Sequence, residues 1–115
     1  MAFVEDNILE RLRKLATPTL ANALDDISFN GIMNDIQPAG IGMCVVGRAV
    51  TVQEITGSFG SFSSDDFKVG HMIDAANSGD VIVVANNGAP VSTWGGMASY
   101  SAKLNKKHQI ILFFK

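Results

Sequence analysis

The fold class is decided by residues 80–85, which read Asp-Val-Ile-Val-Val-Ala, and by the segments that follow them. A short and almost continuous apolar run after Gly79 is typical of a strand that is buried on both faces. Next come the turn cluster Asn86–Pro90, a helical stretch that opens at Gly95-Gly96, and the apolar run Ile110–Phe114. Strand, helix and strand in this order predict a βαβ unit with parallel strands and a right-handed crossover.

Two amphipathic helices are predicted at the N-terminal end. The apolar residues that recur at helical spacing in the first helix are Ile8, Leu9, Leu12 and Leu15. Asp6 or Asn7 can cap this helix. In the second helix Thr17 suits the N-cap and Pro18 suits the first helical position, and the helix should end near Asp25-Asp26.

One long strand and a third helix are predicted between these helices and the βαβ unit. The segment Cys44–Gln53 is rich in β-branched residues, and Cys44 is expected to be a small buried residue of the strand. Residues 57–64 contain Gly and Ser at many positions and predict a loop. Asp65 is then expected to cap a helix that ends near Asn77-Ser78-Gly79.

Composition limits the function classes. The 115 residues are 47% hydrophobic and 17% charged, and we expect them to form one domain whose apolar surface is covered by oligomerisation. A formal charge of −2 disfavours nucleic-acid binding and a polybasic membrane patch, and no apolar run approaches the roughly 20 residues that span a bilayer. Cys44 is the only cysteine, which excludes an intramolecular disulfide, and the N-terminus does not resemble a signal peptide. We therefore expect a cytoplasmic protein.

The step Gly95-Gly96 is the candidate binding site. It lies where a connection enters a helix, so main-chain N–H groups and the positive end of the helix dipole can attract a carboxylate or a phosphate. Glycine also lets a ligand approach the backbone closely. The other interpretation is a tight turn without a ligand, and the residues do not match a Walker or GxGxxG loop.

Other polar and aromatic residues suit structural roles as well as functional ones. His71 with Asp74 can indicate a metal site, although packing at the surface explains both. Asp65-Asp66 looks like a pair of carboxylates, but adjacent helical residues point in different directions and capping explains them better. Trp94 can form a wall of a ligand pocket or anchor the core or an interface.

Four segments in order resemble the RraA-like family, which includes regulators of ribonuclease E activity and 4-hydroxy-4-methyl-2-oxoglutarate aldolases. Residues 17–24 read Thr-Pro-Thr-Leu-Ala-Asn-Ala-Leu, residues 46–52 read Val-Gly-Arg-Ala-Val-Thr-Val, and residues 79–84 read Gly-Asp-Val-Ile-Val-Val. The fourth is Trp94–Ser99, Trp-Gly-Gly-Met-Ala-Ser, followed by Ala102-Lys103. With the flanking helix and the last strand, the resemblance covers about residues 8 to 112.

This resemblance implies an α/β protein with a swivelling β/β/α-type domain that ends in the βαβ unit, and a homotrimer with active sites shared between subunits. In the aldolase branch, the loop that matches Gly95, Gly96, Met97 and Ala98 holds the carboxylate and keto end of a small 2-oxo acid through backbone amides. The family uses a divalent metal, Mg or Mn, and an Arg-Asp pair after the last strand. The Arg clamps the substrate, and the Asp carries the metal through water.

The sequence departs from that pattern at its C-terminal end. Phe113-Phe114-Lys115 stands where the family continues to Asp-Gly and Arg-Asp, and Ala85 stands where members often carry Asp. Residues 1–115 are therefore expected to form a single RraA-like domain, incomplete at its C-terminus, whose metal ligand is absent and whose catalytic residues are unknown. The function implied is a lyase of the class II aldolase or oxaloacetate decarboxylase type with impaired or absent turnover. The alternative is a non-catalytic interaction protein of the ribonuclease E regulator type.

Overall fold

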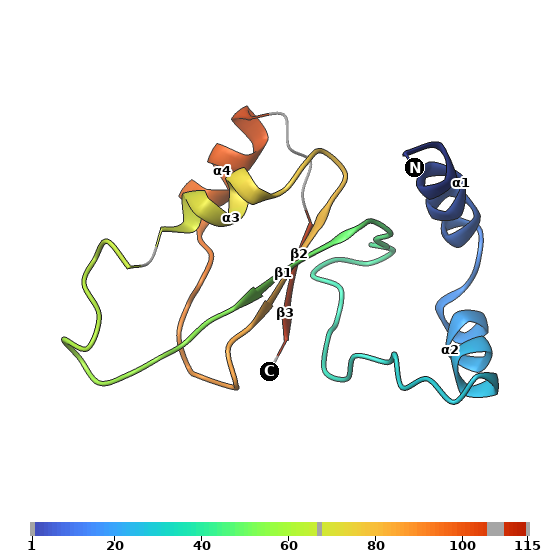
Figure 1. Cartoon of the computed structure of the whole chain (residues 1–115), viewed down its shortest axis with the longest axis horizontal. Coiled ribbons are helices and arrows are strands. Elements are labelled where there is room, and N and C mark those ends of the chain that lie inside the picture. The colour runs from blue at the N-terminus through green and yellow to red at the C-terminus, as the bar shows by residue number, and fades with distance from the viewer. Residues whose placement is uncertain (1, 67, 106–109, 115) are drawn as a thin grey trace. The chain divides into compact units, whose positions relative to one another are not determined.

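The computed structural model describes the backbone of residues 2–66, 68–105 and 110–114, and the side chains of residues 7–66, 68 and 70–105. The chain divides into two compact units, Met1–Val46 and Gly47–Lys115. Figure 1 labels the helices and strands of both units. The expectation of one domain over the whole chain stays a prediction.

The first helix of the N-terminal unit, α1 (Ala2–Arg13), is longer than predicted. Asp6 and Asn7 lie inside it, so their prediction as N-caps is wrong. The physical reason is that neither Gly nor Pro separates residues 2–5 from the apolar stripe, so the helix continues upstream of the first polar residues. Arg11 and Arg13 lie in its last turn, where positive charge complements the helix dipole.

The second helix, α2 (Thr17–Asp26), ends where the sequence predicts but begins one residue earlier. Ala16 is its N-cap, with φ −74° and ψ 145°, so Thr17 is a helical residue and its prediction as the cap is wrong. Pro18 lies in the first turn, where its missing N–H costs no hydrogen bond. Past the end of the helix, Ser28 has φ 56° and donates its N–H to the Asp25 carbonyl at 2.9 Å.

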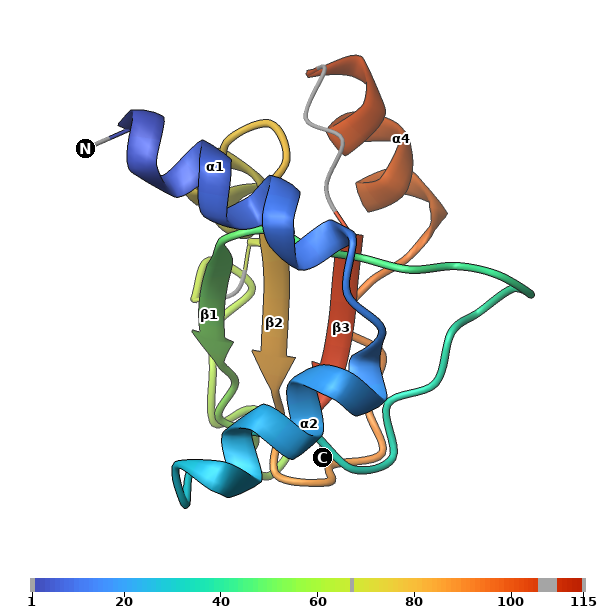
Figure 2. The ribbon, with the colours of Figure 1, turned by 90° about the vertical axis from the view of Figure 1, so that its right-hand side faces the viewer.

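The C-terminal unit is built on a three-stranded parallel sheet in the order β1-β2-β3. The strands are β1 (Ala49–Gln53), β2 (Val81–Ala85) and β3 (Ile110–Phe114). Figure 2 shows them side by side with β2 in the middle and all three arrows pointing the same way. The predicted C-terminal βαβ unit with parallel strands is confirmed. A mixed α/β fold is therefore established, whereas the swivelling β/β/α arrangement stays a prediction.

Strand β1 is shorter than the predicted segment Cys44–Gln53. Ala49 is opposite Val81, the first residue of β2, and the N–H of Val81 donates to the Arg48 carbonyl at 2.7 Å. The paired strand therefore begins at Ala49, and residues 44–47 are not part of it. Cys44 is exposed, so the prediction that it is buried within a strand is wrong.

The core of this unit lies between β2 and the helix α3 (Val69–Ala75). Ile82 and Val84 on β2 are fully buried against Met72 and Ala76. Partly buried residues pack around this cluster, namely Val50, Val52 and Trp94. Of the other β2 residues, Val81 is buried at 6% exposed, whereas Val83 and Ala85 are half-buried. The apolar run is thus buried most fully on its α3 face.

Asp65 does not cap α3, which begins at Val69 after the N-cap Lys68. The reason is a separate local turn, in which the Asp66 carboxylate accepts the Ser63 N–H at 2.7 Å and the Asp66 N–H donates to the Ser63 carbonyl at 3.1 Å. Asp65 instead pairs on the surface with Lys68, Nζ to Oδ1 at 3.4 Å. The paired carboxylates therefore have local roles.

The helix α4 (Gly96–Leu104) opens at the predicted Gly pair. We expect large apolar residues to face a core, yet Met97 is 81% exposed and Leu104 is 64% exposed. The buried residue of this helix is Ala102, and Ala98 and Ser101 are half-buried. Small side chains therefore face inward, and the larger apolar ones face outward. No helix among the described residues is long and apolar enough to cross a membrane.

Candidate functional site

A sharp turn starts the connection between β2 and α4. Asn86 accepts the Gly88 N–H on its side-chain oxygen at 3.1 Å, and its amide nitrogen donates to the Ala89 carbonyl at 3.3 Å. Asn87 and Gly88 both have positive φ, at 55° and 72°. Asn and Gly tolerate this left-handed backbone better than other residues do, which explains why the turn cluster was recognisable in the sequence.

The end of the same connection is attached to the sheet by a buried hydroxyl. Thr93 is 4% exposed, and its Oγ1 donates to the Glu54 carboxylate (Oε2) at 2.8 Å. Glu54 follows β1 directly, and its N–H donates to the Ala85 carbonyl at 2.8 Å, which extends the β1–β2 pairing. The two residues lie 39 positions apart in the sequence, and the hydrogen bond joins the end of one strand to the start of a helix.

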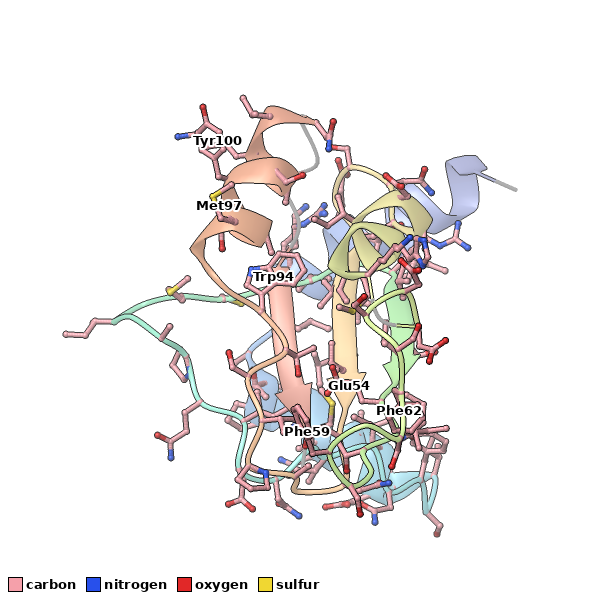
Figure 3. All side chains as sticks on the ribbon, turned by 90° about the vertical axis from the view of Figure 1, so that its left-hand side faces the viewer. Glu54, Phe59, Phe62, Trp94, Met97 and Tyr100 are labelled. Carbon is pink, nitrogen blue, oxygen red and sulfur yellow. The ribbon has the colours of Figure 1, made fainter. Side chains whose placement is uncertain are left out.

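Trp94 holds the next position of the connection. Its ring packs against the buried cluster of Met72, Ala76, Ile82 and Val84, and Figure 3 shows it on the side of the sheet where α3 and α4 lie. Its Nε1 donates to the Ser99 hydroxyl at 2.8 Å, inside the first turns of α4. Of the two interpretations of Trp94, the structure shows the core anchor.

The N-terminus of α4 carries the predicted site residues. Gly95 is the N-cap, with extended φ −138° and ψ −177°, and the first helical hydrogen bond runs from the Ser99 N–H to the Gly95 carbonyl at 3.1 Å. The amides of Gly95, Gly96, Met97 and Ala98 therefore have no acceptor within the helix. No side chain caps this end of the helix. Gly95, Gly96 and Met97 are exposed, and Ala98 is half-buried.

Neither backbone conformation nor lack of space explains why residues 95 and 96 are glycines. A Cβ atom added to Gly95 or to Gly96 would meet no heavy atom within 4 Å, and neither residue has the positive φ that favours glycine. The space on the Cβ side of both glycines is therefore open. A helix N-terminus with unsatisfied N–H groups and open space in front of it suits an anion, and a carboxylate fits as well as a phosphate.

The other candidate residues do not gather at this turn. His71 lies exposed on α3, and Asp74 lies three residues further along the same helix. In the described ranges 7–66, 68 and 70–105, no group of three or more His, Cys, Asp or Glu side chains could hold a metal ion. The Mg or Mn ion that the resemblance implies therefore finds no ligand set among these side chains.

Glu54 is the residue of this region that the sequence interpretation missed. The available signal was its position, because it follows a β-branched strand directly and is half-buried despite its charge. Polar residues at the carboxyl ends of parallel strands commonly line binding sites in α/β folds. The predicted strand gave no indication that this carboxylate would bind a threonine of the helix connection.

Comparison with known proteins gives one match. A family model described as RraA-like, Aldolase/RraA, matches residues 17–113. No curated protein and no solved structure matches the chain. The matched range contains α2, β1, β2, the α4 turn and all of β3 except its last residue, and it makes up more than four-fifths of the chain. The chain therefore belongs to the RraA-like family.

Proposed function

We propose that the chain binds the carboxylate of a small 2-oxo acid at the turn formed by Gly95, Gly96, Met97 and Ala98. Family membership supports an aldolase-like or a regulatory function. The observation that favours the aldolase-like site is the uncapped N-terminus of α4, where Gly95, Gly96 and Met97 are exposed. A carboxylate next to a keto group presents oxygens that several neighbouring N–H groups can donate to together.

The expected affinity is low. The helix dipole contributes about 0.3 to 1 kcal/mol to binding of an anion at an exposed site. A few charge-assisted hydrogen bonds add to this, but part of their gain is lost because the ligand leaves water. Together these terms favour dissociation constants in the millimolar range, near 1 mM at about −4 kcal/mol. The turn is thus proposed to hold the acid end of its ligand.

Turnover makes a further demand on the site. Cleavage of a carbon–carbon bond next to a 2-oxo acid leaves an enolate, which needs a cation or a metal to stabilise its charge. Residues 1–115 contain no Arg-Asp pair, and the described side chains do not form a metal site of three ligands. We therefore derive no step through the family's metal. The proposal is an aldolase- or decarboxylase-like scaffold in which this turn binds the acid end of the ligand.

A second candidate function is an interaction protein that acts through its surface, as the family's ribonuclease regulators do. An apolar stripe on the outer side of α4 favours it, since Met97 and Tyr100 point away from the sheet in Figure 3 and are 81% and 58% exposed. Leu104, one turn further, is 64% exposed. We propose that a homotrimer covers apolar residues of this kind. An interaction module of this kind would not require an open turn at Gly95-Gly96.

Calorimetric titration with three ligands separates the two candidates. Oxalate and pyruvate should bind with millimolar affinity, and methyl pyruvate should bind much more weakly because its ester carries no charge. Added salt should weaken the binding of oxalate, since an exposed helix terminus is screened by ions. Equal affinity for pyruvate and its methyl ester, or no binding of either anion at 20-fold the expected dissociation constant, roughly 20 mM, would favour the interaction protein.

A further inference from the structure

The Glu54–Thr93 hydrogen bond connects the sheet to the candidate binding turn. The Glu54 backbone is fixed on both sides, because its N–H donates to the Ala85 carbonyl at 2.8 Å and its carbonyl accepts Gln53 Nε2 at 3.2 Å. Gln53 Nε2 also lies 3.2 Å from the Ala85 carbonyl. The Glu54 side chain therefore starts from a backbone position that the β1–β2 pairing determines.

Thr93 depends on this carboxylate. Its side chain is 4% exposed, and leaving a buried hydroxyl without a partner is costly. A hydroxyl that donates to a carboxylate makes a hydrogen bond stronger than one between neutral groups. Thr is also branched at Cβ, so its χ1 angle has few allowed values, and the direction of the hydroxyl sets the local backbone.

The position of Thr93 matters because Gly95 follows two residues later. Trp94, between them, packs on the core and donates to Ser99 at 2.8 Å, which is a contact within the start of α4. The Thr93 hydroxyl adds a polar attachment to the end of β1. Core packing and this hydrogen bond together fix where the amides of residues 95–98 lie relative to the sheet.

We infer that Glu54 is a positioning residue, which holds the binding turn of residues 95–98 in place by accepting a hydrogen bond from the Thr93 hydroxyl. This inference rests on the proposed binding of a 2-oxo acid at that turn. The carboxylate acts on the main chain through Thr93 and does not contact the ligand. A direct effect of the negatively charged Glu54 on an anion would be repulsion, so removal of the carboxylate would strengthen binding. Loss of the positioning effect would instead weaken binding.

The test is a set of single variants measured with oxalate as the probe. Glu54→Ala and Thr93→Val each remove one side of the hydrogen bond, and each should weaken oxalate binding about fivefold or more, the effect of roughly one hydrogen bond. The double variant should bind no more weakly than the weaker single variant, because both changes remove the same interaction. Glu54→Gln and Thr93→Ser keep an acceptor and a donor, and they should restore most of the affinity.

Matched controls separate this effect from charge and from loss of stability. Glu10→Ala makes the same charge change on an exposed residue of α1, and Thr51→Val makes the same isosteric change on an exposed residue of β1. Both should leave oxalate affinity unchanged. In the ligand-free protein, Glu54→Ala and Thr93→Val should move the amide resonances of residues 95–98 in the same direction.

Three results would overturn the inference. Tighter oxalate binding in Glu54→Ala would show that the carboxylate acts mainly by repulsion. Unchanged affinity in both single variants, with normal binding by the parent chain, would overturn the positioning role and leave the proposed function intact. Absence of oxalate binding by the parent chain would overturn the proposed function, and the inference with it.

Discussion

Replacing Gly96 by Ala should raise the stability of the protein and lower its affinity for a carboxylate. Replacing glycine by alanine at a position without positive φ stabilises a protein by about 0.4 to 1 kcal/mol, because alanine has less backbone freedom to lose on folding. A Cβ atom at position 96 meets nothing within 4 Å, so no clash offsets this gain. For a domain of this size the change corresponds to a rise in Tm of roughly 2 to 8 °C.

The same methyl group should interfere with the ligand. Cα–Cβ bonds in a helix tilt toward its N-terminus, so a side chain at position 96 extends over the amides that face the proposed ligand. Loss of one charge-assisted hydrogen bond corresponds to about a tenfold weaker dissociation constant. Thermal unfolding monitored by circular dichroism and calorimetric titration with oxalate measure the two effects.

Gly70→Ala is the matched control. Gly70 also lies in the first turn of a helix, α3, and a Cβ atom there meets nothing within 4 Å. This variant should be stabilised in the same way, with unchanged oxalate affinity. If Gly96→Ala were more stable and bound oxalate as tightly as the parent chain, the space in front of Gly96 would not be the ligand site.

Three further predictions follow from the sequence and the structure. The chain of residues 1–115 should release no pyruvate from oxaloacetate or 4-hydroxy-4-methyl-2-oxoglutarate above background with added Mg or Mn, because it contains no Arg-Asp pair; release at an enzyme-like rate that a chelator abolishes would contradict this. Sedimentation velocity should show a homotrimer, and a monomer at all concentrations would leave the exposed residues of α4 without the proposed cover. Gly47→Ala should lower the free energy of unfolding by about 1 to 3 kcal/mol, because the added Cβ would collide with the Gly79 carbonyl oxygen. Urea unfolding measures this as a lower midpoint, and an unchanged midpoint would show that the backbone can shift at this contact.

The parts of the fold that the sequence predicts well are those with strong local signals. The apolar run of β2 and the turn at Asn86-Asn87-Gly88 are both found where expected, because each depends on residues adjacent in sequence. The start of α4 at Gly95-Gly96 is correct for the same reason. The parallel pairing of β2 with β3 follows from the short crossover and the handedness of such units.

The errors arise where a distant partner or competing local bonds decide the outcome. The start of β1 depends on where β2 begins, which Cys44–Gln53 alone does not encode. The start of α3 depends on the Ser63–Asp66 turn, which uses the carboxylate next to the one that was expected to cap the helix. The inward side of α4 is formed by the small residues Ala98, Ser101 and Ala102, which give no strong apolar signal in the sequence.

The candidate site also has a part that the sequence predicts and a part that it does not. Gly95 and Gly96 could be identified from sequence because a glycine pair before a helix is a local signal of exposed amides. The attachment of that turn to the sheet could not, because the bond from Thr93 to Glu54 spans 39 positions in the sequence. Neither residue type indicates such a partner on its own.

The most direct test of the central claim is an amide-resolved titration of the 115-residue chain with oxalate, followed by two-dimensional nitrogen–proton NMR. The account predicts saturable shifts that are largest for residues 94–98 and that share one millimolar dissociation constant. Lys103→Ala, in the last turn of α4, should leave those shifts nearly unchanged. Shifts that saturate elsewhere while residues 94–98 do not move would contradict the claim that this turn binds the carboxylate.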